Sequence, residues 1–305
     1  MKKFIISVIV VVIGVLIIDR IVGKIMWWVN LHTQEHACTK IRHMVNDVER
    51  PILLMGTSRC HQHYVPSIIR DSIGMDVYNG GINSSDNIFA HYILLNLILQ
   101  RYHPQVICLE VSANDFRKQE APFNAVGFFA PYFGRCEQSD SVFRLANLYW
   151  QYKTFKMFRY NAKATSSIAG LFAAPADIPE DGYVPQPRPD SSIDYAPSVM
   201  EGASEIDSIK INYIHRFIST CKRNKIQLMF TISPEYSIVT ESSYSVLKTI
   251  AAKERIPLLD YHSQKLFLNK PELFHDYNHL WDEGARIYTS IFAKDLKQFL
   301  YSRQL

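Results

Sequence analysis

The sequence lacks any concentration of charge of one sign. It has 33 Lys and Arg residues against 29 Asp and Glu residues, a net charge of +4, and its basic residues are dispersed without a long run. A nucleic-acid-binding surface usually shows clustered basic side chains. We therefore expect no nucleic-acid partner. The 48% of hydrophobic residues is typical of a folded core and excludes disorder as the default state of the 305 residues.

Cysteine is scarce as well, and its spacing excludes the usual metal motifs. The chain has five cysteines, an odd number, and none are paired at CxxC spacing. This pattern predicts mostly free thiols. His61 and His63 have no carboxylate or cysteine at zinc-ligand spacing. We expect neither a metal nor a cofactor.

The chain has one long apolar run, at its N-terminus. Residues 4–18 carry no charge, follow Lys2 and Lys3, and continue after a short charged break into apolar sequence up to Trp27 and Trp28. The extended run reaches the ~20 residues of a membrane-spanning helix. Tryptophans at its end are typical of the membrane interface.

A cleaved signal peptide begins in the same way, with positive charge before a short apolar region. No good A-x-A cleavage site follows Ile18, however, which favours an uncleaved anchor. We predict that residues 1–30 are a single-pass anchor in the bacterial cytoplasmic membrane, followed by a juxtamembrane segment at 31–50. The domain at 51–305 is then expected on the periplasmic or extracellular side.

Strand-like and helical patterns alternate through this domain. Strands are predicted at 52–55, 75–78, 106–111, 226–232 and 257–260, and helices at 65–71, 87–101, 205–223, 243–255 and 282–301. Alternation of this kind is typical of a parallel sheet with helices on both faces. The fold class we predict is a three-layer α/β/α domain with a five-stranded, mainly parallel sheet.

Residues 116–204 interrupt the alternation without a strand signal, and we interpret them as an insertion. Its first part is rich in aromatic residues and its second part in proline. Two interpretations are equally supported. The aromatic side chains form a lid or platform for a sugar or acyl chain, or they form a satellite core beneath a long loop.

Candidate catalytic residues lie at both ends of the domain. Ser58 directly follows the first predicted strand, while Asp276 and His279 share one short segment near the end. A serine hydroxyl becomes a good nucleophile when an imidazole takes its proton and a carboxylate orients that imidazole. The alternatives are that Ser58 caps the following helix and that Asp260 replaces Asp276.

Acyl transfer also needs donors for the oxyanion that develops on the attacked carbonyl. The segments 78–85 and 111–115 each follow a predicted strand. Backbone N–H groups of Ser58 and Ser84 and the side-chain amide of Asn114 are the candidates. Asn114 has the alternative of shaping a turn. Arg59, beside the nucleophile, is predicted to bind an anionic substrate. The alternatives are that it pairs with a carboxylate or that it is a solvated residue at the start of a helix.

The order of these motifs resembles that of the SGNH/GDSL hydrolase superfamily. Its members carry a nucleophilic serine near the first strand, an oxyanion glycine after the second, an oxyanion asparagine after the third, and a late Asp-x-x-His. This chain has Ser84 and Ser112 where the family usually has glycine. Ser58 also lacks the Gly-x-Ser-x-Gly elbow of the rival α/β-hydrolase fold.

The resemblance implies a flavodoxin-like sheet and a serine esterase or acyltransferase that works through an acyl-enzyme. By the same resemblance, the expected substrate is an O-acyl group, above all O-acetyl, on a cell-envelope glycan. The alternative is a non-catalytic envelope protein of this fold that binds glycan or a membrane acyltransferase partner.

Overall fold

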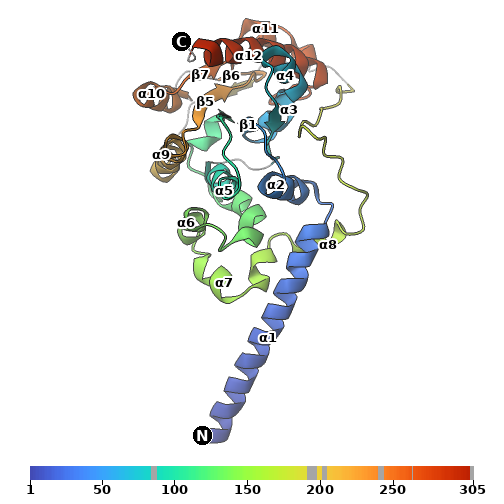
Figure 1. The fold of residues 1–305 in the computed structure, drawn as a ribbon, viewed down its shortest axis with the longest axis vertical. Coiled ribbons are helices and arrows are strands. Elements are labelled where there is room, and N and C mark those ends of the chain that lie inside the picture. The colour runs from blue at the N-terminus through green and yellow to red at the C-terminus, as the bar shows by residue number, and fades with distance from the viewer. Residues whose placement is uncertain (84–87, 191–197, 201–204, 240–243, 263, 303–305) are drawn as a thin grey trace.

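The chain forms an α/β body from which one long helix projects (Figure 1). The computed structural model describes residues 1–83, 88–190, 198–200, 205–239, 244–262 and 264–302. The projecting helix is α1 (Lys2–His32), at the N-terminus. The C-terminal helix α12 (Asp282–Ser302) lies at the opposite end of the molecule.

The centre of the body is a parallel sheet with the strand order β2-β1-β3-β5-β7. Its strands are β1 (Ile52–Met55), β2 (Val77–Asn79), β3 (Val106–Glu110), β5 (Gln227–Ile232) and β7 (Leu258–Asp260). Every residue of β1 and β3 is buried, as in parallel strands covered on both faces. The predicted five-stranded parallel sheet is confirmed, in the order 2-1-3-4-5 of flavodoxin-like folds.

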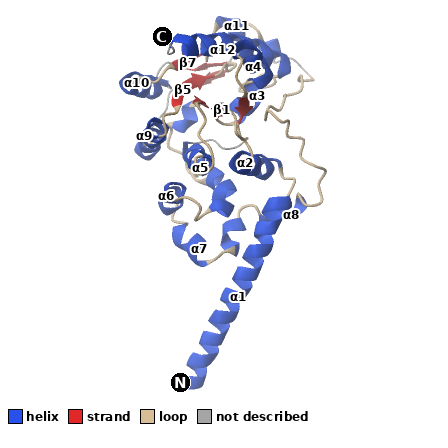
Figure 2. Ribbon diagram, in the orientation of Figure 1, coloured by secondary structure: helices blue, strands red, loops and turns tan. Residues whose placement is uncertain are grey.

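Helices cover both faces of this sheet, which confirms the three-layer architecture (Figure 2). One layer contains α2 (His36–Asn46), α5 (Ile88–Ile98), α9 (Ser208–Arg223) and α10 (Ser245–Glu254). The other contains α3 (Ser58–His63), α4 (Pro66–Ile73), the short α11 (Lys265–Leu268) and α12. Each layer shares its own apolar cluster with the sheet.

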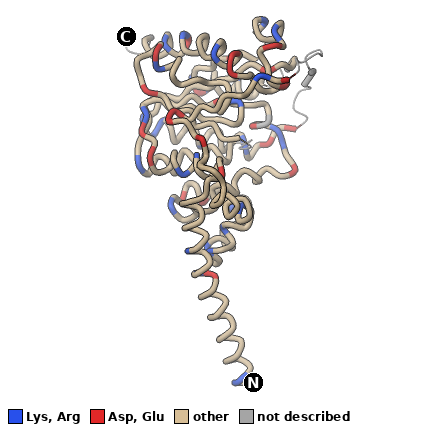
Figure 3. The backbone as a smooth tube through the Cα atoms, turned by 90° about the vertical axis from the view of Figure 1, so that its right-hand side faces the viewer, with Lys and Arg blue, Asp and Glu red and all other residues tan. Residues whose placement is uncertain are grey.

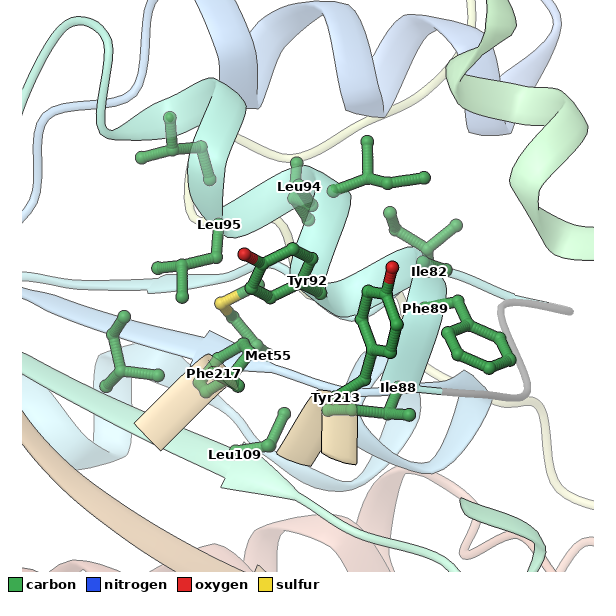
Figure 4. Packing of buried hydrophobic residues seen from close by; sticks show 14 of the residues in the cluster. Met55, Ile82, Ile88, Phe89, Tyr92, Leu94, Leu95, Leu109, Tyr213 and Phe217 are labelled. Carbon is green, nitrogen blue, oxygen red and sulfur yellow. The ribbon is translucent and has the colours of Figure 1, made fainter. Parts of the chain in front are cut away.

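Helix α5 is buried on all sides, because the sheet, the neighbouring helices and the insertion all pack against it. In Figure 4 its Phe89 and Tyr92 face Tyr213 of α9, and Met55 and Leu109 extend from the strands into the same cluster. The Phe89 and Tyr213 rings meet edge to face, with centroids 5.0 Å apart. The outer side of α5 packs against α6 (Glu137–Leu145) of the insertion. A helix that is apolar all round requires such full cover.

The aromatic part of the insertion packs as the satellite-core interpretation predicts. Its helical elements are η2 (Asn124–Tyr132), α6, α7 (Tyr149–Thr154), η3 (Met157–Tyr160) and α8 (Ala164–Ala169). Phe129, Phe143 and Tyr152 are buried and belong to the same cluster as α5. Most of these aromatic side chains therefore stabilise the body, and a lid or platform made of them is not what the structure shows.

The ends of the insertion meet, because Arg117 and Ile206 form an antiparallel bridge. The insertion contains a strand although its sequence shows no strand signal. Strand β4 (Ser198–Met200) pairs in parallel with β6 (Ser237–Val239) to form a separate two-stranded sheet. A strand of three residues is too short to produce a detectable period, which is why the pattern gave no signal.

Helix α1 has an exposed apolar half and a half that packs on the insertion. In Figure 3 the projecting helix carries no charged residue between its N-terminal end and an acidic segment close to the body. From Asp19 onward the helix contacts the body: the Asp19 carboxylate accepts the N–H groups of Lys156 (2.8 Å) and Met157 (3.0 Å). The helix is long and apolar enough to cross a membrane, a test that a signal sequence also passes.

Candidate active site

The candidate residues of the site follow strands β1 and β3, at the point in the sheet where the strand order changes direction. The chain passes from β1 outward to β2 and then returns to β3 on the other side of β1. Ser58 is the first residue of α3, just after β1, and η1 (Ala113–Asp115) follows β3. The carboxyl ends of strands at such a switch point are the usual ligand-binding position in open α/β sheets.

Ser58, His279 and Asp276 lie in a continuous hydrogen-bonded row. The Ser58 Oγ is 2.8 Å from His279 Nε2, although 221 positions separate the two residues. His279 Nδ1 is 2.9 Å from each carboxylate oxygen of Asp276. The helix cap at this point is Thr57, so Ser58 does not take the capping role. The rival carboxylate Asp260 instead pairs with His262 and Lys248.

The local fold of the 276–279 segment sets the geometry of the imidazole. Asp276 Oδ1 accepts the backbone N–H groups of Asn278 (2.8 Å) and His279 (2.9 Å), as in an Asx turn. Burial alone would raise the pKa of Asp276, but hydrogen bonds from His279 and these N–H groups lower it. Asp276 is therefore charged at neutral pH. It favours the tautomer with hydrogen on Nδ1, which leaves Nε2 to accept the Ser58 hydroxyl.

Asn79 and Gly81 hold α3 against the loop after β2. The Asn79 Nδ2 donates to the carbonyl oxygens of Cys60 (2.7 Å) and Tyr64 (2.8 Å), and its Oδ1 accepts the Gly81 N–H (3.0 Å). A Cβ atom at Gly81 would lie 2.2 Å from the backbone nitrogen of His61. Glycine is therefore required there for close approach of the two backbones.

We expect Gly81→Ala to destabilise the protein by about 1–3 kcal/mol, since the clash is with backbone and α3 must move. Chemical denaturation of the full chain in detergent measures this change. Gly14→Ala, where a Cβ would meet nothing within 4 Å, is the matched control and should leave stability unchanged. Equal stability of Gly81→Ala and the wild type would show that the loop is not held as described.

A neutral histidine connects the segment that holds Asp276 and His279 to the interior of the body. His63 is buried; its Nε2 accepts the N–H of Leu280 (3.0 Å), the residue after His279, and its Nδ1 lies 2.9 Å from Ser233 Oγ. Burial, with the nearby His279 and Arg59, lowers the pKa of His63 well below its ordinary value. The neutral ring therefore donates from Nδ1 and positions the backbone beside His279.

Arg59 is buried beneath Ser58, with 4% of its surface exposed. It pairs with Glu110 at the end of β3 (2.8 Å) and with Glu235, and also donates to the Val111 carbonyl oxygen (3.2 Å). The prediction that Arg59 binds substrate is wrong, because two carboxylates occupy the guanidinium and cover it. The alternative, pairing with a carboxylate, is the arrangement found. Burial raises the pKa of Glu110 to about 7.

Removing the guanidinium leaves two buried carboxylates without a counter-charge. We expect Arg59→Leu to lower the free energy of unfolding by about 3–5 kcal/mol. Urea denaturation monitored by circular dichroism measures it. Arg70→Leu removes an exposed partner of Asp71 and should change stability by less than about 0.5 kcal/mol. If both variants unfold alike, the buried cluster contributes nothing specific.

The structure places the predicted oxyanion residues only in part. Ser58 stands at the first turn of α3, where backbone N–H groups have no acceptor within the helix. Ser84 lies outside the described residues, and of Asn114 only the backbone, in η1, is described. The Ser112 Oγ and N–H both bond to Asp115, at 3.1 and 2.8 Å. The Ser112 hydroxyl is thus engaged within its own turn.

Two further reactive side chains of α3, those of Cys60 and His61, are buried. Cys60 is buried, and burial raises the pKa of its thiol well above the ordinary value, so it is not a thiolate. His61 Nδ1 is 2.6 Å from the ammonium of Lys40, a buried residue of α2. Burial and this ammonium lower the pKa of His61 to about 2. All five cysteines are free thiols.

The proline-rich part of the insertion contacts the segment around Asp276 and His279, which the sequence did not predict. The Gln186 carbonyl oxygen accepts the N–H of Asp282 (3.0 Å), and the Pro187 carbonyl oxygen lies 2.9 Å from His275 Nδ1. The Tyr183 hydroxyl donates to the Asp282 carboxylate (2.8 Å). The segment with Asp276 and His279 is therefore held from outside as well as from the core.

Comparison with known proteins adds little to this geometry. No protein-family model matches the chain, and no curated protein matches it. Among solved structures it is similar to a protein assigned to the G-D-S-L lipolytic family from Desulfitobacterium hafniense, with a TM-score of 0.39 and 11% identity, over 80% of this chain and 97% of that one. Likeness at this level carries no argument. The class that the sheet and site define is a flavodoxin-like α/β protein with a Ser-His-Asp row.

Proposed function

We propose that this protein is a serine hydrolase or acyltransferase of the SGNH type, which forms an acyl-enzyme on Ser58. The observation that carries the proposal is the 2.8 Å contact between Ser58 Oγ and His279 Nε2, backed by the Asp276 carboxylate. A half-exposed serine bonded to an oriented imidazole is the arrangement that activates a hydroxyl for attack on an ester.

In the first step His279 Nε2 takes the Ser58 proton while Oγ bonds to the ester carbonyl carbon. Asp276 stabilises the imidazolium, and the Ser58 N–H, with Ser84 N–H and the Asn114 amide in the SGNH arrangement, binds the oxyanion. The imidazolium then returns its proton to the departing alcohol oxygen. An incoming hydroxyl, from water or from an acceptor, releases the acyl group by the reverse sequence.

We further propose that residues 1–30 anchor the enzyme as a single membrane span, with residues 51–305 forming the catalytic domain on the periplasmic or extracellular side of a bacterial membrane. The contacts of Asp19 with the insertion support an uncleaved helix, because a removed signal sequence has no such partner in the mature body. Lys2 and Lys3 favour a cytoplasmic N-terminus.

The substrate we propose is an O-acyl group, in the first place O-acetyl, on a cell-envelope glycan. The SGNH resemblance supports this choice, together with the proposed position outside the cytoplasmic membrane. Fold alone does not determine substrate, so the acyl group and acceptor require direct assay.

The test is turnover of acyl esters by the full chain in detergent micelles. We expect the enzyme to release p-nitrophenol from p-nitrophenyl acetate. With an acetylated glycan we expect one of two products: free acetate, or an added glycan whose hydroxyl has received the acetyl group. Release without transfer identifies a hydrolase, and transfer identifies an acyltransferase. No turnover of any ester would instead favour a non-catalytic protein that binds glycan or a membrane acyltransferase partner.

A further inference from the structure

A cavity of about 390 Å³ lies where α1 meets the insertion. Five of its lining residues are basic: Arg20, Lys24, Arg135, Lys156 and Arg159. None of the lining residues described there is acidic. This basic cavity is separate from the candidate catalytic site. Helix α3 lies in the upper half of Figure 1, whereas the junction of α1 with the insertion lies at the lower end of the body.

The nearest carboxylates are already occupied. Asp19 accepts two backbone N–H groups of the insertion and pairs with Arg20 at 2.5 Å, and Asp140 accepts the Gly134 N–H (3.0 Å). Partial burial and the charges of Arg159 and Arg20 lower the pKa of Lys156. Arg20 is therefore paired, whereas Lys24, Arg135, Lys156 and Arg159 form no ion pair with a described carboxylate, and an anion would relieve the repulsion among them.

One side of this cavity is formed by a single face of α1. Arg20, Gly23, Lys24 and Trp27 recur at the spacing of a single helix face. A Cβ atom at Gly23 would lie 2.5 Å from the Lys156 Cβ, so glycine lets η3 approach the helix closely. The rings of Trp27, Phe133 and Tyr160 complete the lining with apolar surface.

The position of the cavity along α1 matches the headgroup layer of a bilayer. Arg20 and Lys24 follow the uncharged stretch 4–18 by about 3 to 9 Å along the helix axis. The headgroup layer begins at the hydrocarbon boundary and is about 5–8 Å thick. The insertion helices α7 and α8 lie at the end of the body from which α1 projects (Figure 1), and the insertion exposes the apolar side chains of Trp150, Phe155 and Phe172. Exposed aromatic residues are typical of this interface.

We propose that this cavity binds the phosphate group of an anionic membrane phospholipid. Arginine and lysine side chains supply the charge and the fork geometry that phosphate oxygens accept. The apolar rings contact the lipid beside its headgroup. The site is separate from the proposed activity at Ser58 and does not depend on it.

Native mass spectrometry of the full chain in detergent, titrated with phosphatidylglycerol, tests the proposal. We expect one tightly bound lipid per chain. Lys24→Gln combined with Lys156→Gln should weaken binding about tenfold. Lys153→Gln combined with Lys163→Gln removes the same charge nearby but outside the cavity, and should change affinity less than about twofold. If the lysine variant does not fold, Arg135→Gln takes its place.

Three outcomes would overturn the proposal. Equal loss in both double variants would indicate general attraction to anionic lipid, and equal binding of diacylglycerol would remove the role of phosphate. Displacement of the lipid by inorganic phosphate alone at equal concentration would identify a free-anion site. Ser58→Ala should bind lipid as the wild type does, so failure here and failure of the esterase proposal are distinguishable.

Discussion

Ser58→Ala is expected to reduce kcat for p-nitrophenyl acetate by about 10⁶-fold, because the variant has no hydroxyl to form the acyl-enzyme. His279 keeps its two contacts with Asp276, and the lost hydroxyl is at a half-exposed position. The melting temperature should therefore stay within a few degrees of the wild type. Initial rates of p-nitrophenol release, with thermal unfolding of the same samples, measure both quantities.

Ser290→Ala is the matched control, since it removes an exposed hydroxyl of α12 that bonds only within its own helix to the Arg286 carbonyl. Its kcat should equal that of the wild type. Ser58→Ala retaining more than about one hundredth of wild-type kcat would mean that another group, or water alone, attacks the ester.

Asp276→Asn has the second largest expected effect, a fall in kcat of about 10⁴-fold. An asparagine keeps the shape, and its Oδ1 can still accept the N–H groups of Asn278 and His279, so the turn should persist. It carries no charge to stabilise the imidazolium and can favour the wrong tautomer of His279. Steady-state kinetics with the same ester measure the loss.

Asp260→Asn is the control for this prediction, because Asp260 was the rival orienting carboxylate and pairs with His262 and Lys248 instead. Its kcat should change by less than about tenfold. A larger loss in Asp260→Asn than in Asp276→Asn would reverse the assignment of the orienting group.

The sheet was predictable because strands covered on both faces are continuous apolar runs. Ile52-Leu53-Leu54-Met55 is such a run, and the structure places it inside the sheet, between β2 and β3. The spacing of turns then located Ser58 at a strand end. The pair Asp276 and His279 was detectable because both belong to one turn, so their contact is local.

The environment of Arg59 was not predictable, since its partners Glu110 and Glu235 lie far along the chain and meet it only in the folded sheet. One signal was present: Glu110 ends an otherwise apolar strand, and a charge in such a run needs a buried counter-charge. His63 was considered only as a metal ligand. Its contact with the Leu280 N–H depends on how α3 packs against the 276–280 segment.

The most direct test of Ser58 as the activated nucleophile is covalent labelling with a fluorophosphonate, followed by mass spectrometry of the digested protein. We expect a single phosphonyl adduct on Ser58, formed by the wild type and greatly slowed in His279→Ala, because the imidazole activates the hydroxyl. The absence of any adduct on the folded wild type, or an adduct on a residue other than Ser58, would contradict this role of Ser58.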